Sequence, residues 1–107
     1  MDDIKIFTTP ILDGIRILEY KDPLIIRNVR AMSIVHDLMT RVRDFVGGRS
    51  GAYQDVMKKI EDEIIEEIKA KAVEQGANAI VGFNLDFDSI DGLLMGCAQG
   101  TAVVIES

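Results

Sequence analysis

The stretch LLMGCAQGTAVVIE, residues 93–106, decides the fold of this chain. As a β-strand it places Met95, Cys97 and other larger side chains on one face. The opposite face then carries a row of small residues, which let a helix or a neighbouring backbone approach closely. They are Gly96, Ala98, Gly100 and Ala102. Neither face suits water, so we expect each face to be covered, and one of the covers to come from another copy of the chain.

Further strands are expected upstream of this segment. Residues 79–88 alternate between apolar and polar side chains, with Val81, Phe83, Leu85 and Phe87 on one face, and this half-buried pattern is typical of antiparallel sheets. Residues 4–7 predict a short strand. Residues 15–20 and 24–31 predict two more, joined as a hairpin by Lys21-Asp22-Pro23.

Two helices are expected between these groups of strands. Residues 33–46 carry apolar side chains at steps of three and four, after Ser33 as N-cap. Residues 52–75 show a longer stripe of the same kind, closed by Gly76. At 1.5 Å per residue this second helix would be about 35 Å long, so it would project beyond a small domain or lie across several strands.

Composition limits the class of protein. The 107 residues fit one domain, 1–107, and aromatic residues make up only 6% of them, so the core must use aliphatic side chains. No apolar run approaches the roughly 20 residues of a membrane helix, and the acidic start lacks a secretory pattern. A single cysteine suits a reducing cytoplasm. These features predict a cytoplasmic protein with no membrane partner.

Charge is unevenly distributed along the chain. Residues 1–53 contain eight basic and seven acidic side chains, whereas residues 54–107 contain four basic and eleven acidic ones. The net charge is −6. Because nucleic acids require a cationic face, this acidic total argues against nucleic acid as a partner.

A glycine-rich joint separates the two expected helices. It offers unpaired N–H groups at a helix start, beside an arginine, which is an arrangement that binds phosphate, sulfate or a carboxylate. The alternative is that the glycines only allow a sharp turn. The candidate ligand-binding residues are Gly47, Gly48, Arg49, Ser50, Gly51 and Tyr53.

A metal site is the second candidate. Cys97 is a possible ligand for a heavy-metal ion, particularly if several copies contribute one thiolate each. The alternative is that Cys97 is a small buried hydrophobic residue. Asp86, Asp88 and Asp91 resemble a calcium loop, but the spacing is off by one and Cys97 stands where the closing glutamate belongs. No nucleophile is paired with a base, so the sequence predicts a protein that is not an enzyme.

Four blocks of this sequence carry a resemblance to a known family. They are Phe7-Thr8-Thr9-Pro10, the string from Arg43-Asp44 through Val46-Gly47-Gly48-Arg49-Ser50-Gly51-Ala52-Tyr53, Gly76-Ala77-Asn78-Ala79-Ile80-Val81-Gly82, and Gly100-Thr101-Ala102-Val103. With these blocks the whole chain resembles the YbjQ-like family of small bacterial and archaeal proteins, often labelled heavy-metal-binding. The family's glutamate after the motif tyrosine is Gln54 here, and the family's Gly-Val-Val-x-Gly-Glu region is replaced by residues 22–28.

The resemblance implies both a fold and an assembly. The fold is an α+β subunit, with an antiparallel sheet of about four to five strands and two helices, one of them long. The assembly is a ring-shaped homopentamer without an established activity. We therefore expect a homo-oligomer that binds a small ligand near the joint, or alternatively a heavy-metal ion at Cys97 and nearby carboxylates.

Overall fold

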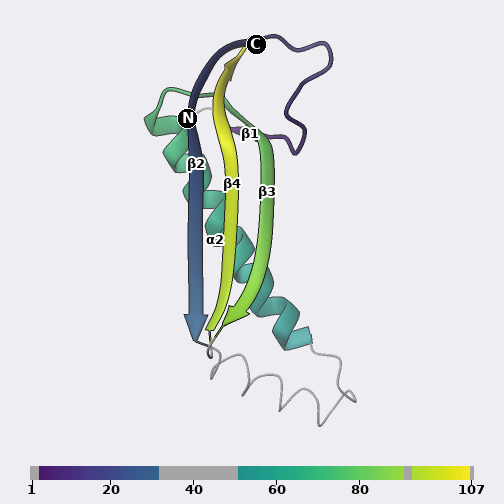
Figure 1. Ribbon diagram of the computed structural model, residues 1–107, viewed down its shortest axis with the longest axis vertical. Helices are drawn as coiled ribbons and strands as arrows, with labels where there is room; N and C mark the ends of the chain where they lie inside the picture. The colour runs from purple at the N-terminus through teal and green to yellow at the C-terminus, as the bar shows by residue number, and fades with distance from the viewer. Residues whose placement is uncertain (1–2, 32–50, 91–92, 107) are drawn as a thin grey trace.

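The computed structural model describes residues 3–31, 51–90 and 93–106. The fold is α+β: within these ranges lie one helix and a four-stranded sheet of order β1-β3-β4-β2, and the helix covers one face of the sheet (Figure 1). The elements are β1 (Lys5–Ile6), β2 (Ile17–Ala31), α2 (Gly51–Glu74), β3 (Ala79–Ile90) and β4 (Leu93–Ile105). The predicted helix over residues 33–46 lies outside the described residues.

The sheet is mixed, so the expectation of an antiparallel sheet is wrong at one edge. β2 and β3 both run antiparallel to β4, whereas β1 runs parallel to β3, with Lys5 opposite Ala79 and Ile6 opposite Ile80. Parallel partners require a long connection, and more than 70 residues separate β1 from β3. The sequence of residues 4–7 alone does not indicate which distant strand this short segment pairs with.

The predicted hairpin at Lys21-Asp22-Pro23 is also wrong, because β2 runs through it as a single strand. The register against β4 shifts between Tyr20 and Pro23, which marks a β-bulge. The Asp22 amide, turned out of the ladder, donates to Oε1 of Gln75 at 2.9 Å. Pro23 is tolerated here because β2 is an edge strand in the described part of the sheet.

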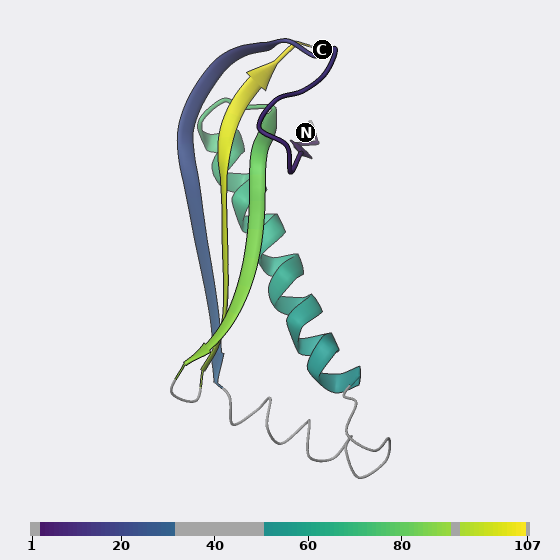
Figure 2. The same ribbon diagram turned by 45° about the vertical axis from the view of Figure 1, so that its right-hand side comes forward.

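The long helix is confirmed, and it lies along the sheet (Figure 2). Its buried stripe packs on the row of small residues in β4. A Cβ added to Gly96 would lie only 2.8 Å from Cγ2 of Ile60 and 2.9 Å from Cδ1 of Ile64. The prediction that small residues admit a helix is therefore confirmed. The side chains of this stripe are fully buried: Ile60, Ile64, Ile68 and Ala72.

A bulge in β3 divides the strand into two halves. Its register against β4 shifts between Val81 and Asn84, and Gly82 adopts a positive φ of 66° there. The extra residue reverses the alternation. Phe83 consequently packs toward α2, whereas Val81 belongs to a cluster on the opposite face, so the prediction that both share one face is wrong.

The chain itself covers the upper part of the face that points away from α2. Val103 and Ile105 of β4 are buried there beneath residues 7–17, which we call the N-terminal segment. The segment is held by the Phe7 amide, which donates to Ile80, and by the Gly82 amide, which donates to Thr9. For this part of the sheet, the expectation that another copy supplies the cover is wrong. The covering side chains are Phe7, Leu12, Ile15 and Ile17.

No helix in the described ranges combines the length and apolar character needed to cross a bilayer.

Candidate functional site

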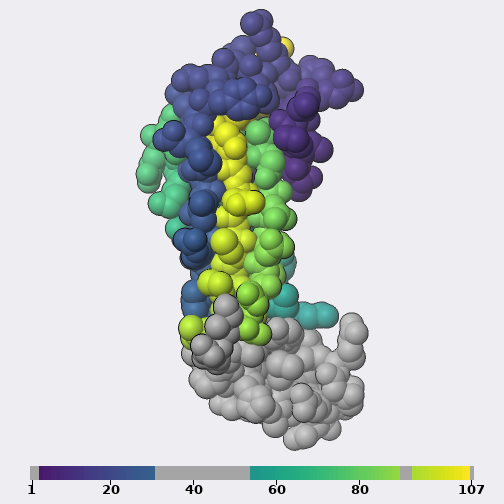
Figure 3. Space-filling model, viewed as in Figure 1, coloured from purple at the N-terminus to yellow at the C-terminus, as the bar shows by residue number. Residues whose placement is uncertain are grey.

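Below the N-terminal segment, the sheet face that points away from α2 lies uncovered by the described part of the chain (Figure 3). We call this surface the open face. Its side chains alternate with those that pack on α2, and they come from three adjacent strands. It consists of Ile25, Arg27 and Val29 of β2, Met95, Cys97 and Gln99 of β4, and Asn84, Asp86 and Asp88 of β3.

The register arranges the open face in three rows, each crossing β2, β4 and β3. Arg27, Cys97 and Asp86 form the middle row, and the rows on either side begin at Ile25 and Val29. Side chains directly opposite in neighbouring strands lie about 4.5–5.5 Å apart at Cβ. The face therefore changes from apolar and basic at β2, through sulfur at β4, to acidic at β3.

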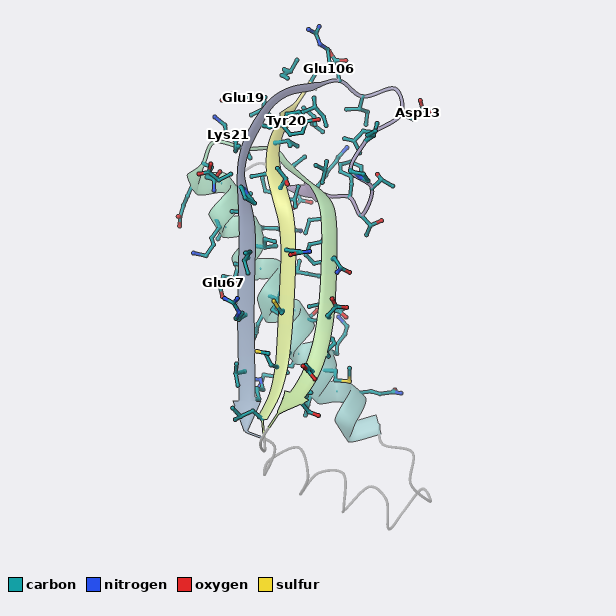
Figure 4. All side chains as sticks on the ribbon, viewed as in Figure 1. Asp13, Glu19, Tyr20, Lys21, Glu67 and Glu106 are labelled. Atoms are coloured by element: carbon teal, nitrogen blue, oxygen red, sulfur yellow. The ribbon has the colours of Figure 1, made fainter. Side chains whose placement is uncertain are left out.

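Two apolar side chains on this surface are strongly exposed. Ile25 keeps 55% and Val29 keeps 49% of its surface accessible. Leu18 and Tyr20, further up the same strand, are exposed as well. In the sequence Tyr20 stands between Glu19 and Lys21, whose side chains form an ion pair of 2.9 Å, and Figure 4 labels all three residues. Exposed apolar side chains grouped on one strand indicate a contact surface.

Two of the predicted metal ligands come together on the open face. Cys97 is a free, half-buried cysteine directly opposite Asp86, and Asp88 lies one row away. A soft thiolate next to a carboxylate can contribute two ligands, fewer than the usual four of a closed zinc site. In the described part of the chain, no group of three or more His, Cys, Asp or Glu side chains could hold a metal ion. A complete site would need ligands from elsewhere.

The remaining predicted site residues lie outside the described residues, or only their backbone is described. The residues outside the described ranges are Asp91, Gly47, Gly48, Arg49 and Ser50. Gly51 and Tyr53 lie in the first turn of α2. The anion site at the joint therefore stays a prediction.

A shallow depression adjoins the upper end of the open face. Its volume is about 190 Å³, and it lies where β2 and β3 both carry bulges opposite the same part of β4. Each bulge interrupts the regular pairing of its strand with β4 next to this depression. The lining residues are Pro23, Leu24, Ile25, Gly82, Gln99, Gly100 and Thr101.

The opposite side of the sheet carries an ion-pair network between β2 and α2. Glu63 Oε1 accepts a hydrogen bond from Nδ2 of Asn28 at 2.9 Å and another from Nη2 of Arg30 at 2.6 Å. These two donors hold the pKa of the Glu63 carboxyl below its usual value. On the same helix, a hydrogen bond to Asp62 raises the pKa of Lys58. The network joins α2 to β2 on the side of the sheet opposite the open face.

The sequence reasoning did not select Arg27, Ile25 or Val29. Their importance depends on the pairing of β2 with β4, which places Arg27 beside Cys97. The only local signal is the composition of residues 25–30, where every residue except Asn28 is apolar or basic.

Comparisons with known proteins agree with this fold. The model of the YbjQ family, described as "Putative heavy-metal-binding", matches residues 4–106. A "UPF0145 protein" of Persephonella marina is 38% identical over 101 residues, which is 94% of this chain and 98% of the relative. A "UPF0145 protein" of Bacillus cereus is 42% identical over 99 residues, covering 92% of this chain and 96% of the relative.

One solved structure supports the architecture. It is a protein with unknown function of the DUF74 family from Pediococcus pentosaceus, with a TM-score of 0.57 and 17% sequence identity. The similarity covers 96% of this chain and 98% of the solved one. At this identity the likeness shows the fold alone.

Proposed function

This chain belongs to the YbjQ-like family, which is uncharacterised, and from that premise we propose that it acts as a non-enzymatic homo-oligomer of five subunits. The self-association is supported by the structure of one copy, and the number five by the resemblance to the family. In this proposal the assembly is the functional unit, and it is cytoplasmic, in keeping with the single free cysteine.

The observation that carries the proposal is the set of exposed apolar side chains on β2. Ile25 and Val29 lie on the open face, and Leu18 and Tyr20 follow on the same strand. Fully burying a side chain such as isoleucine contributes roughly 1.5–3 kcal/mol. Covering these residues at an interface therefore provides a substantial driving force for association.

Native mass spectrometry of the untagged protein tests the assembly. We expect a species of about five times the subunit mass of 11.8 kDa. A double variant with Ile25→Ser and Val29→Ser should shift the spectrum toward the single subunit. The control is Val73→Ser, which replaces an apolar residue of α2 that is 39% exposed and lies outside the open face. A wild-type protein that stays a single subunit at micromolar concentration would contradict the proposal.

We further propose that the assembly binds a small anion near the glycine-rich joint, at clefts between subunits. The support is the sequence of residues 47–53, where Arg49 precedes a helix start. Isothermal titration with inorganic phosphate should show binding that Arg49→Gln abolishes. Lys59→Gln, which removes an exposed cation from α2, serves as control and should leave binding intact. Phosphate binding that is unchanged in Arg49→Gln would argue against this site.

A second candidate function is binding of a heavy-metal ion, and the register of Cys97 opposite Asp86 favours it. Two ligands from one copy are too few, so a second copy must complete the coordination shell. Titration with Cd²⁺ should produce a thiolate charge-transfer band in the ultraviolet, which Cys97→Ser removes and Asp86→Asn weakens. Asp55→Asn, an exposed carboxylate on α2, is the control. A charge-transfer band of the same strength in Asp86→Asn would show that the Asp86 carboxylate is not a ligand of the metal ion.

A further inference from the structure

We propose that copies of this chain join through their sheets, with the outer edge of β2 in one copy pairing with the lower outer edge of β3 in the next. This inference rests on the proposed self-association and identifies the strands that make it. The partner is a second copy of this chain, held by backbone hydrogen bonds and by contacts across the open face.

Both edges lack a strand partner in the described part of the molecule. β2 is the last strand of the sheet and pairs only with β4. β3 is covered at its upper end by β1 and by hydrogen bonds from Phe7 to Ile80 and from Phe83 to Phe7. Below Phe83, residues 84–90 have β4 on one side only. Unpaired N–H and C=O groups along such an edge form a template for another strand.

The two edges match in height and length. Residues 25–31 of β2 and residues 84–90 of β3 flank the same segment of β4, residues 93–99, and both registers run there without a shift. Above this level the bulges and Pro23 interrupt β2, and such features block strand addition. The pairing is therefore confined to the lower half of the sheet, beside the open face.

Charge selects head-to-tail pairing. Arg27 lies on β2 and Asp86 lies two strands away on β3, roughly 10 Å apart by strand spacing. Among the described residues, no ion pair joins Arg27 to Asp86 or to Asp88 within one copy. When β3 of the next copy adds to β2, Arg27 meets those aspartates. Pairing β2 with β2, or β3 with β3, would instead place like charges opposite each other, which is destabilising.

The strand directions are compatible with a closed ring. β2 and β3 are each antiparallel to β4, so they run parallel to each other. Adding β3 of one copy to β2 of the next by a rotation about an axis near the strand direction makes a parallel ladder and repeats the same step for every copy. Such a heterologous interface closes into a ring when the rotation closes. Closure leaves no lower edge unpaired.

Cysteine cross-linking tests which edges meet. In a Cys97→Ser background, Ile25→Cys together with Asn84→Cys should give, under mild oxidation, a ladder of disulfide-linked species that ends at the subunit number of the assembly. Each single cysteine variant is a control that should remain uncross-linked. Dimers from Ile25→Cys alone would instead show β2 paired with β2 and would overturn the proposal.

Charge reversal provides an independent test that keeps the backbone unchanged. Arg27→Glu should weaken association by roughly a factor of ten or more, because it faces two aspartates across the interface. Combining Arg27→Glu with Asp86→Arg in the same chain should restore association. Circular dichroism of each variant confirms that the subunit is folded.

The outcomes separate this inference from the proposed function. A wild-type protein that is a single subunit in native mass spectrometry overturns both. An oligomer with neither the cross-linked ladder nor sensitivity to Arg27→Glu overturns the edge pairing alone. In that case the open face is covered by another part of the chain or by a different contact.

Discussion

Gly96 shows how a single residue sets the distance between the helix and the sheet. An added Cβ would lie 2.8 Å from Cγ2 of Ile60, which is a branch close to the helix backbone and cannot move far. We expect Gly96→Ala to destabilise the subunit by about 1–3 kcal/mol, the usual range for overpacking a core.

Chemical denaturation measures this change, and Ala70→Met on the exposed side of α2 is its control, expected within about 0.5 kcal/mol of wild type. A Gly96→Ala protein as stable as the control would show that the helix sits more loosely than described.

Glu63 links the stability of the subunit to pH. Hydrogen bonds from Asn28 and then from Arg30 lower the pKa of its carboxyl below the ordinary 4.5. A carboxyl whose pKa is lower in the folded state stabilises the fold above its unfolded-state pKa and loses that contribution as the pH falls through the folded-state value. Stability should therefore fall below about pH 4.5 more steeply in wild type than in Glu63→Gln.

The check is the free energy of unfolding between pH 7 and pH 3 for both proteins. Glu67→Gln is a matched control on the same helix, since among the described residues no hydrogen-bond partner of its carboxylate is found. If Glu63→Gln and Glu67→Gln showed identical pH profiles, the network with β2 would contribute nothing measurable.

Asp86 and Cys97 mark the limit of prediction from sequence at this scale. Cys97 was selected as a candidate ligand for its thiol, and Asp86 for its place in a series of aspartates that resembles a calcium loop. Their position opposite each other depends on the register between β3 and β4, which the bulge at Gly82 sets. Arg27, in the same row, was not selected, because strand pairing and not local sequence brings it there.

At the scale of elements, Gly82 determines which face of β3 each side chain takes. Its φ of 66° lies in the left-handed region, and no atom lies within 4 Å of an added Cβ. We expect Gly82→Ala to cost about 1–2 kcal/mol through backbone strain alone. Thermal unfolding measures the loss, and Gln99→Ala on the neighbouring strand is a control with ordinary strand geometry. No loss of stability would mean that the bulge tolerates a side chain.

The elements that carry a strong period were predictable, and those defined by irregularities were not. The stripe of α2 and the small-residue row of β4 each follow one regular repeat, so both the elements and their contact could be predicted. In β2, Lys21-Asp22-Pro23 has the composition of a turn but forms a bulge, because Gln75 at the end of α2 satisfies the Asp22 amide. That partner lies 53 residues away, beyond the reach of local reasoning.

For the whole molecule, the structure changes the reason for proposing an assembly. The upper end of β4 needs no second copy, because residues 7–17 of the same chain bury Val103 and Ile105. What one described copy leaves exposed is the lower half of the sheet, where β2 carries Ile25 and Val29 and two edges lack partners. In the proposed assembly, other copies therefore contact the edges and the open face of the sheet more than its final strand.

Amide hydrogen exchange of the wild-type protein tests the proposed edge pairing most directly. In a strand paired on one side only, about half of the amides point to solvent, whereas a strand paired on both sides has nearly all of its amides protected. We predict slow exchange for nearly all amides of residues 25–31 and 84–90, and faster exchange at alternate positions in Arg27→Glu. Alternate amides of both segments that exchange at unprotected rates in the wild-type protein would contradict the account.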